Sequence, residues 1–297
     1  MHVEDIRPWQ HPHDFLGSAH GTGERKMWAV VALTVAMMAA EIIGGHVFGS
    51  MALVADGWHM ATHAAALGIA ALAYRIARAY SSNPAFSFGT GKVGELAAFV
   101  SAIILVGIAA YIGVDCAMHL LRPEPIRFAE AFPIAVLGLL VNLASAWLLH
   151  DDDEEDLNRR AAFVHVLADA LTSVAAIASL GAAWAWGWNW LDPISGLVGA
   201  IVIAAWAKGL IISAAKVLLD AVPDPALAAE IKSRLELDLD RVSDLHLWRL
   251  GPGHFGLVVT VVTDAPQAPE VYKARLSGLT GLSHVTVEVA ACPGDAA

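Results

Sequence analysis

Six apolar segments occupy most of the first 220 residues and constrain this chain more than any other feature. They are residues 27–48, 51–73, 96–121, 132–149, 161–186 and 190–219. Each is long enough to cross, as a helix, a hydrocarbon core about 30 Å thick. The composition agrees, because 57% hydrophobic and 16% charged residues with a mean hydropathy of +0.58 are typical of a polytopic membrane protein. We expect an α-helical membrane protein with six transmembrane helices over residues 27–220.

Basic residues gather on one side of the predicted segments. That side carries Arg7, Arg25, Lys26, Arg75, Arg78, Lys92, Arg159, Arg160, Lys208 and Lys216, and the other side has mainly Arg122 and Arg127. The positive-inside rule therefore places both termini in the cytoplasm. The first 26 residues are polar and lack the apolar core of a cleaved signal peptide. We expect a multi-pass protein of the cell membrane, in bacteria the inner membrane.

Two polar stretches flank or interrupt the apolar segments. Residues 1–26, predicted to form a cytoplasmic tail, carry His2, His11, His13 and His20. This tail is interpreted either as disordered or as a weak metal collector. The run from Asp151 to Asp156 is either a solvated linker or a loop that concentrates divalent cations at a channel mouth. Cys116 and Cys292 fit neither a disulfide framework nor a metal motif, and the net charge of −11 argues against nucleic acid as a partner.

The character of the sequence changes at Pro223 and Pro225, which end the last apolar segment. Helical periodicity is present in 226–239 and 268–279, and strand-like sequence in 242–250, 255–262 and 285–290. The order αββαβ predicts a ferredoxin-like α+β domain over residues 221–297, with its helices on one face of the sheet.

Two pairs of metal-ligand side chains lie inside apolar segments. His59 and His63 are four residues apart, and so are His165 and Asp169, so each pair projects from one helical face. Ionisable groups within a membrane span are costly and usually functional. Three imidazole nitrogens and one carboxylate oxygen suit Zn²⁺ and Co²⁺ in tetrahedral coordination, and Ni²⁺ less well. The two pairs predict one reversible cation site, although interhelical hydrogen bonding is the alternative.

Other intramembrane polar groups leave several roles open. Asp56, one turn before His59, is interpreted as a fifth ligand, as an acceptor that orients His59, or as a proton carrier. Asp115 and His119 form a third four-residue pair and a rival metal site. Glu41 and Asn142 are explained by interhelical bonding or by lining a water-filled cavity.

Two other classes of protein use histidines within a membrane. A metallohydrolase with a His-Glu-x-x-His motif needs a general base, but Met60 occupies that position here. A b-type haem protein also uses histidines on separate spans, but adjacent ligands four residues apart suit one small ion better than axial ligation of haem. We therefore expect a transporter and not an enzyme.

Several motifs resemble the cation diffusion facilitator family over nearly the whole chain. The run from Gly49 to Met60, GSMALVADGWHM, resembles the family's second-span signature, and Phe86 to Lys92 followed by Glu95 resembles the loop after it. The sequences DLHLW at Asp244 and HVTVE at His284 resemble its cytoplasmic domain.

The resemblance implies export of divalent metal from the cytoplasm by proton antiport, carried out by a homodimer. It also implies one central site per protomer, at His59, His63, His165 and Asp169. In such a mechanism alternating access re-exposes the site, and protonation of imidazole releases the ion outside.

Two departures from the family pattern bear on the metal. Zinc-exporting branches generally have Asp where this chain has His63, and His there resembles the cobalt/nickel-efflux branch. A nitrogen ligand disfavours hard ions such as Mn²⁺ but does not exclude zinc, so a zinc-specific exporter of the same family is the alternative. In the cytoplasmic domain Ser243 replaces a frequent histidine, so His246, His254 and His284 are either metal ligands or structural residues.

Overall fold

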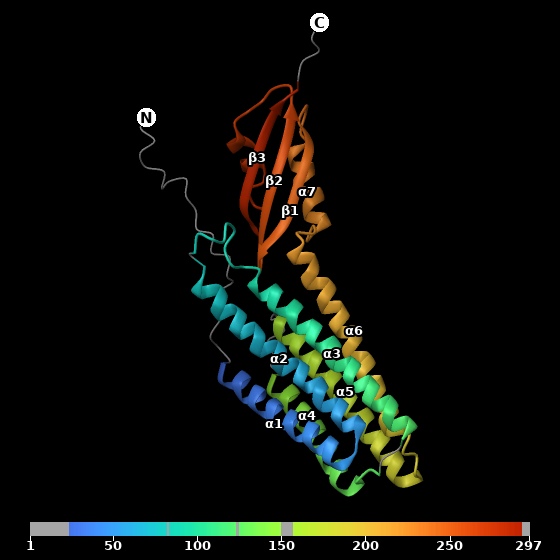
Figure 1. The fold of residues 1–297 in the computed structure, drawn as a ribbon. Coiled ribbons are helices and arrows are strands. Elements are labelled where there is room, and N and C mark those ends of the chain that lie inside the picture. Colours follow the sequence, from blue (N-terminus) through green and yellow to red (C-terminus); the bar gives the residue numbers. More distant parts are fainter. Residues whose placement is uncertain (1–23, 82, 123–124, 150–156, 293–297) are drawn as a thin grey trace. The chain divides into compact units, whose positions relative to one another are not determined.

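A computed structural model describes residues 24–81, 83–122, 125–149 and 157–292 (Figure 1). Its long helices are α1 (Glu24–Phe48), α2 (Met51–Ala79), α3 (Val93–Leu121), α4 (Phe128–Leu149), α5 (Leu157–Trp186) and α6 (Leu191–Leu218). Within these helices the side chains of 24–31, 62–68, 70, 71, 74, 146, 148, 149, 157–169 and 171 are outside the description. The tail histidines and the acidic run 151–156 also lie outside the described residues.

The chain divides into two compact units, which we describe separately. The helical unit comprises His20–Ala70 and Ala98–Ile211. The sheet unit comprises residues 71–97 and 212–292 of the described chain.

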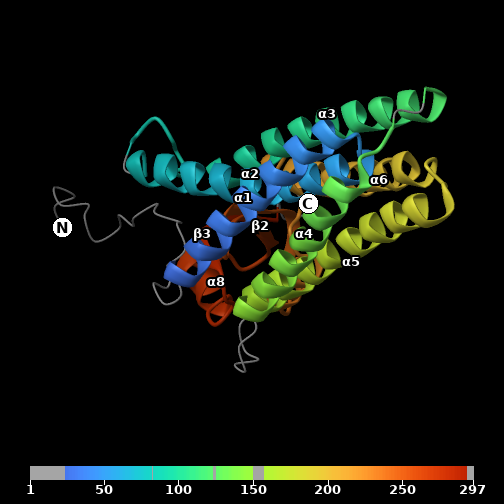
Figure 2. The ribbon, with the colours of Figure 1, turned by 90° about the horizontal axis from the view of Figure 1, so that it is seen from below.

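Helix α2 occupies the centre of the helical unit. Val54 and Ala55 pack in one apolar cluster with α3 and α6, whereas Leu53 packs in another with α4 and α5. Helix α4 in turn packs against both α1 and α5 (Figure 2). Small residues allow the close approach, since a Cβ at Gly57 would lie 2.9 Å from the Ile42 backbone nitrogen of α1. The start of α2 is thus surrounded by other helices.

The outward faces of the helices are apolar. Large exposed side chains include Ile103 and Val114 on α3, Leu140 on α4, and Val198 and Ile201 on α6. By length and composition, three stretches of the described residues could cross a membrane: Val93–Leu121, Phe128–Ser145 and Leu191–Leu218. Ala32–Phe48 and Thr172–Trp186 are shorter apolar stretches. Exposed apolar surface on this scale is expected where lipid, and not water, is the solvent.

Each predicted apolar segment coincides with one of the helices α1 to α6, and the predicted ends differ by a few residues. The prediction of a helical membrane domain is therefore confirmed. That all six helices span the bilayer stays a prediction.

The sheet unit contains the predicted αββαβ order. Its elements are α7 (Pro225–Leu235), β1 (Arg241–Gly251), β2 (His254–Thr263), α8 (Pro269–Arg275) and β3 (Leu282–Ala291). The sheet order is β1-β2-β3, with β1 antiparallel and β3 parallel to β2. Leu247, Leu257 and Val287 belong to the face that packs with Ile231 of α7 and Tyr272 of α8. Both helices therefore cover one sheet face, as predicted.

Both helices of this unit end earlier than periodicity predicts. Helix α7 ends at Leu235 because Glu236 leaves the helical conformation, with ψ at 70°, and Asp238 is then left-handed with φ at 54°. Helix α8 ends at Arg275, shortly before Gly278, where φ is 86°. Left-handed conformations cannot continue a helix, so the apolar residues beyond them lie in turns.

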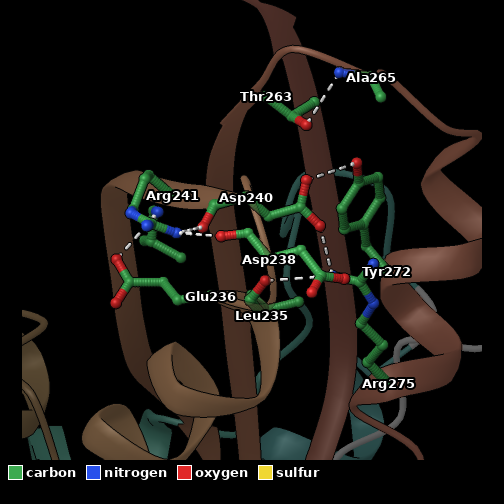
Figure 3. Close-up of polar contacts among 10 residues, drawn as sticks. Leu235, Glu236, Asp238, Asp240, Arg241, Thr263, Ala265, Tyr272 and Arg275 are labelled. Atoms are coloured by element: carbon green, nitrogen blue, oxygen red, sulfur yellow. Dashed lines mark hydrogen bonds and ion pairs between the residues drawn. The ribbon is translucent and has the colours of Figure 1, made fainter.

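Asp240, the residue before β1, contacts α8 in the sheet unit (Figure 3). Its carboxylate accepts hydrogen bonds from Arg275 Nη1 at 2.7 Å and Tyr272 Oη at 3.5 Å. A hydrogen bond from the Thr263 side chain, followed by the hydrogen bond and charge of Arg275, lowers the pKa of Asp240 against the opposing effect of burial.

Candidate metal-transport site

Helix α2 brings His59 into the interior of the helical unit. The side chains from Met51 to Met60 are buried apart from the partly buried Trp58, and His59 is 9% exposed. The other three predicted ligands, His63, His165 and Asp169, lie within α2 and α5, but their side chains are outside the described residues. The four-ligand site therefore stays a prediction.

Asp56 joins α2 to α5 one turn from His59. Asp56 Oδ1 accepts a hydrogen bond from Thr172 Oγ1 at 2.9 Å, and Oδ2 accepts one from Ser173 Oγ at 2.7 Å. Ser173 also accepts a hydrogen bond from Asn142 Nδ2 of α4 at 3.1 Å. Three helices thus meet in one polar cluster.

Helices α2 and α5 run antiparallel through this cluster. The first residue of α2, Met51, and the residue that follows α5, Gly187, line the same cavity of about 300 Å³. A second cavity of about 60 Å³ lies beside Asp56 and His59, and its other lining residues include Thr172 and Ala176 of α5 and Ser195 of α6. This second cavity is large enough to hold water beside His59.

Asp192, in the first turn of α6, caps the N-terminus of α2. It accepts hydrogen bonds from Ser50 Oγ at 2.7 Å and from the backbone N–H of Met51 at 2.6 Å. The first N–H groups of a helix have no intrahelical partner, and the carboxylate also complements the helix dipole. Asp192 therefore fixes the start of the helix that carries His59 and His63.

The rival pair lies on α3, where His119 Nδ1 is 2.9 Å from the Asp115 carbonyl oxygen and 3.6 Å from Asp115 Oδ1. Among the described residues no group of three or more His, Cys, Asp or Glu side chains could hold a metal. Asp115 and His119 alone therefore give an ion two protein ligands at most within the described part of the chain.

Glu41 of α1 is fully buried between α2 and α4. Among the described residues neither of its carboxyl oxygens has a hydrogen-bond partner. Gly138 of α4 provides the room for this carboxyl group, because a side chain at that position would overlap Glu41 Oε1. The sequence interpretation of Glu41 as an interhelical hydrogen-bonding group has no support among these contacts.

Three histidines of the sheet unit contact different groups. His246 Nε2 lies 2.8 Å from Asp244 Oδ2, and both side chains are exposed. His254 Nδ1 lies 2.7 Å from Ser283 Oγ. The His284 ring packs edge-on against Phe88, with ring centroids 5.4 Å apart.

Phe88 belongs to the connection between α2 and α3, which contacts the sheet within the sheet unit. Its ring also packs edge-on against Trp248 of β1, at a centroid distance of 5.6 Å. Gly91 allows the backbone to approach the Leu250 carbonyl oxygen, which a Cβ would overlap. Glu95 Oε1 lies 3.6 Å from Arg249 Nη1, and Lys92 forms an ion pair with Asp220, which follows α6.

The sequence interpretation missed three contributors to these contacts. Thr172 and Ser173 lie one turn after Asp169, as Asp56 lies one turn before His59, and this mirrored spacing is the signal that could have identified them. Asp192 gave no comparable signal, because an acidic residue in the first turn of a helix usually serves that helix alone.

Comparison with known proteins gives one family and several relatives. The cation efflux transmembrane domain matches residues 27–219. The zinc transporter ZitB of Escherichia coli is 36% identical over 246 residues, covering 81% of this chain and 78% of ZitB. The metal cation efflux system protein CzcD of Cupriavidus metallidurans is 34% identical over 297 residues, covering 95% of this chain and 90% of CzcD. A cadmium, cobalt and zinc/H(+)-K(+) antiporter of Bacillus subtilis is 26% identical over 292 residues, covering 92% of each chain.

Proposed function

Because the chain belongs to the cation efflux family, the cation diffusion facilitators, we propose that it exports divalent transition-metal ions from the cytoplasm in exchange for protons. It is a transporter and not an enzyme. We further propose that cobalt and nickel are its main substrates, with zinc also carried, and that it works as a homodimer. Both termini and the domain over residues 221–297 lie in the cytoplasm in this proposal.

The observation that supports the proposal best is the contact of Asp56 with Thr172 and Ser173. His59 lies three residues after Asp56 on α2, and Asp169 lies three residues before Thr172 on α5. Because the two helices are antiparallel, equal steps lead to the same level of the helical unit. A further four residues on each helix lead to His63 and His165. The two pairs therefore belong to matching turns of α2 and α5.

The relatives support metal transport but give no reason to favour cobalt or nickel over zinc. Their names include zinc, cadmium and cobalt. The proposed preference rests on His63, since histidine at that position resembles the cobalt/nickel-efflux branch of the family. A third imidazole in place of a carboxylate disfavours hard metals but does not by itself separate cobalt or nickel from zinc. Protons compete for the same imidazole nitrogens, because histidine loses its proton near neutral pH and binds metal only when neutral.

Transport assays in proteoliposomes with an imposed pH gradient test the proposal. We expect the wild type to carry Co²⁺, Ni²⁺ and Zn²⁺ but not Mn²⁺, and His63→Asp to shift the preference towards Zn²⁺. His46→Asp, the same change at an exposed histidine of α1, is the matched control and should leave the preference unchanged.

Three outcomes would contradict separate parts of the proposal. An unchanged preference in His63→Asp would show that His63 does not select the ion. Transport that is independent of the pH gradient would exclude proton antiport. Background rates for all four metals in the wild type would exclude divalent-metal efflux.

A further inference from the structure

Asp56 connects the two helices that carry the proposed ligands. We propose that it is a positioning residue, which holds α2 and α5 in the register that brings His59 and His63 opposite His165 and Asp169. This inference rests on the proposed function, because the register matters to transport only if the two pairs bind one ion.

The contacts of Asp56 are buried and come from the opposite helix. Asp56 is 5% exposed, and Ser173 is fully buried. A buried carboxylate is stable only when donors satisfy its oxygens. Here each oxygen accepts one hydroxyl of α5, from Thr172 and from Ser173. The carboxylate therefore favours the one register in which both hydroxyls reach it.

Asn142 of α4 orients the Ser173 hydroxyl. A hydroxyl group has one proton to donate and two lone pairs that accept. The Asn142 amide N–H donates to the Ser173 oxygen, and the Ser173 proton is directed to Asp56. The hydrogen bonds thus run in one direction from α4 through α5 to α2, which strengthens each of them.

The distance from the cluster to the ligands is short on both helices. Asp56 precedes His59 by three residues, and Thr172 follows Asp169 by three residues, so each lies on the same face as its ligand. A slip of α2 by one turn would displace its ligands by about 5.4 Å. Metal–ligand bonds tolerate deviations of about 0.2 Å. A cross-link one turn away is therefore well placed to preserve the site.

The hydroxyls distinguish positioning from direct ligation. If Asp56 acts by fixing the register of α2 and α5, removing the hydroxyls of Thr172 and Ser173 should weaken metal binding. Every proposed ligand, and Asp56 itself, is retained in that variant. If Asp56 is a ligand, removing the hydroxyls should have little effect on the ion, whereas Asp56→Ala should abolish or change its coordination.

Binding of Co²⁺ to the purified full chain tests this, since the visible absorption of Co²⁺ reports tetrahedral geometry as well as affinity. The variants are Ser173→Ala, the double variant Thr172→Val/Ser173→Ala, Asp56→Asn and Asp56→Ala. Ser179→Ala is the matched control, because Ser179 is a buried serine of α5 that donates to its own helix at Ala176. The Michaelis constant and maximal rate of Co²⁺ transport are measured in parallel.

We expect Ser173→Ala to weaken Co²⁺ binding about tenfold and the double variant more, with a changed absorption band. The Michaelis constant should rise by a similar factor while the maximal rate changes little. Asp56→Asn, which retains one acceptor oxygen for Ser173, should bind more tightly than Asp56→Ala. Ser179→Ala should match the wild type.

The inference would be overturned if the double variant bound Co²⁺ with the affinity and absorption of the wild type. It would also be overturned if Asp56→Ala lost Co²⁺ binding while the hydroxyl variants kept it. Absence of Co²⁺ binding by the wild type would instead contradict the proposed function. In that case hydrogen exchange of α5, measured without metal, tests whether Asp56 cross-links α2 and α5. Faster exchange around 170–178 in Ser173→Ala than in Ser179→Ala supports the cross-link, and equal rates overturn it.

Discussion

The Asp192 carboxylate of α6 accepts a 2.6 Å hydrogen bond from the backbone N–H of Met51, the first residue of α2. One buried acid therefore lies at the N-termini of two helices and joins them. Because α2 carries His59 and His63, the position of the proposed site depends on a residue outside it.

Asp192→Ala should destabilise the helical unit by about 1–3 kcal/mol, because it leaves the Ser50 hydroxyl and the Met51 N–H buried without their partner. Thermal unfolding in detergent and metal transport in proteoliposomes measure the effect. Asp224→Ala is the control, since Asp224 caps α7 in the sheet unit and its loss should cost about 0.5–2 kcal/mol. Equal transport in both variants would contradict a role of Asp192 in positioning α2.

Gly138→Ala should destabilise the contact of α1 with α4, because the added methyl group overlaps the Glu41 carboxyl. The same substitution should be tolerated in a Glu41→Ala background, where that carboxyl is absent. Unfolding of the two single variants and the double variant gives the coupling between the sites. Gly107→Ala, at a glycine with open space around it, is the control. Additive effects of the two substitutions would contradict the overlap.

The sheet unit should lose stability in acid through Asp240. Its lowered pKa means that the stabilisation is present above the unfolded value of about 3.9 and is lost as the pH falls through the folded value. Asp240→Asn should therefore cost about 1–3 kcal/mol at neutral pH, and the difference from wild type should shrink below about pH 4.

Urea titrations of the full chain at several pH values measure this difference, with hydrogen exchange in β2 as the readout of unfolding. Asp264→Asn, at an exposed neighbouring position, is the control and should resemble the wild type at every pH. A difference between Asp240→Asn and wild type that stays constant down to pH 3 would show that the ionised carboxylate is not the stabilising group.

Gly91→Ala should separate the connection between α2 and α3 from β1, because the new methyl group overlaps the Leu250 carbonyl oxygen. Phe88 should then lose its contact with Trp248. Hydrogen exchange at the end of β1 should become faster. Gly94→Ala adds the same methyl group where the space is open and should leave the exchange unchanged. Identical exchange in both variants would contradict the close approach.

The local features of this protein are readable in its sequence. The apolar segments predict α1 to α6 because a run of apolar residues is a property of neighbouring positions, and the αββαβ order follows from periodicity and from Pro223 and Pro225. The four-residue spacing of His59 and His63 places both on one helical face for the same reason. The ends of α7 and α8 were predicted too late, since apolar residues continue beyond the turns at Asp238 and Gly278.

The partners across helices required the tertiary structure. Asp56 and Ser173 are 117 residues apart, and Met51 and Asp192 are 141 apart, so no local pattern connects them. Which polar groups meet depends on how the helices pack, and packing depends on small residues such as Gly57 and Gly138 on facing helices. The sequence by itself thus determined the helices and the spacing of the ligand pairs. The tertiary structure decided which turn of α5 faces Asp56, because a buried carboxylate must find its donors on another helix.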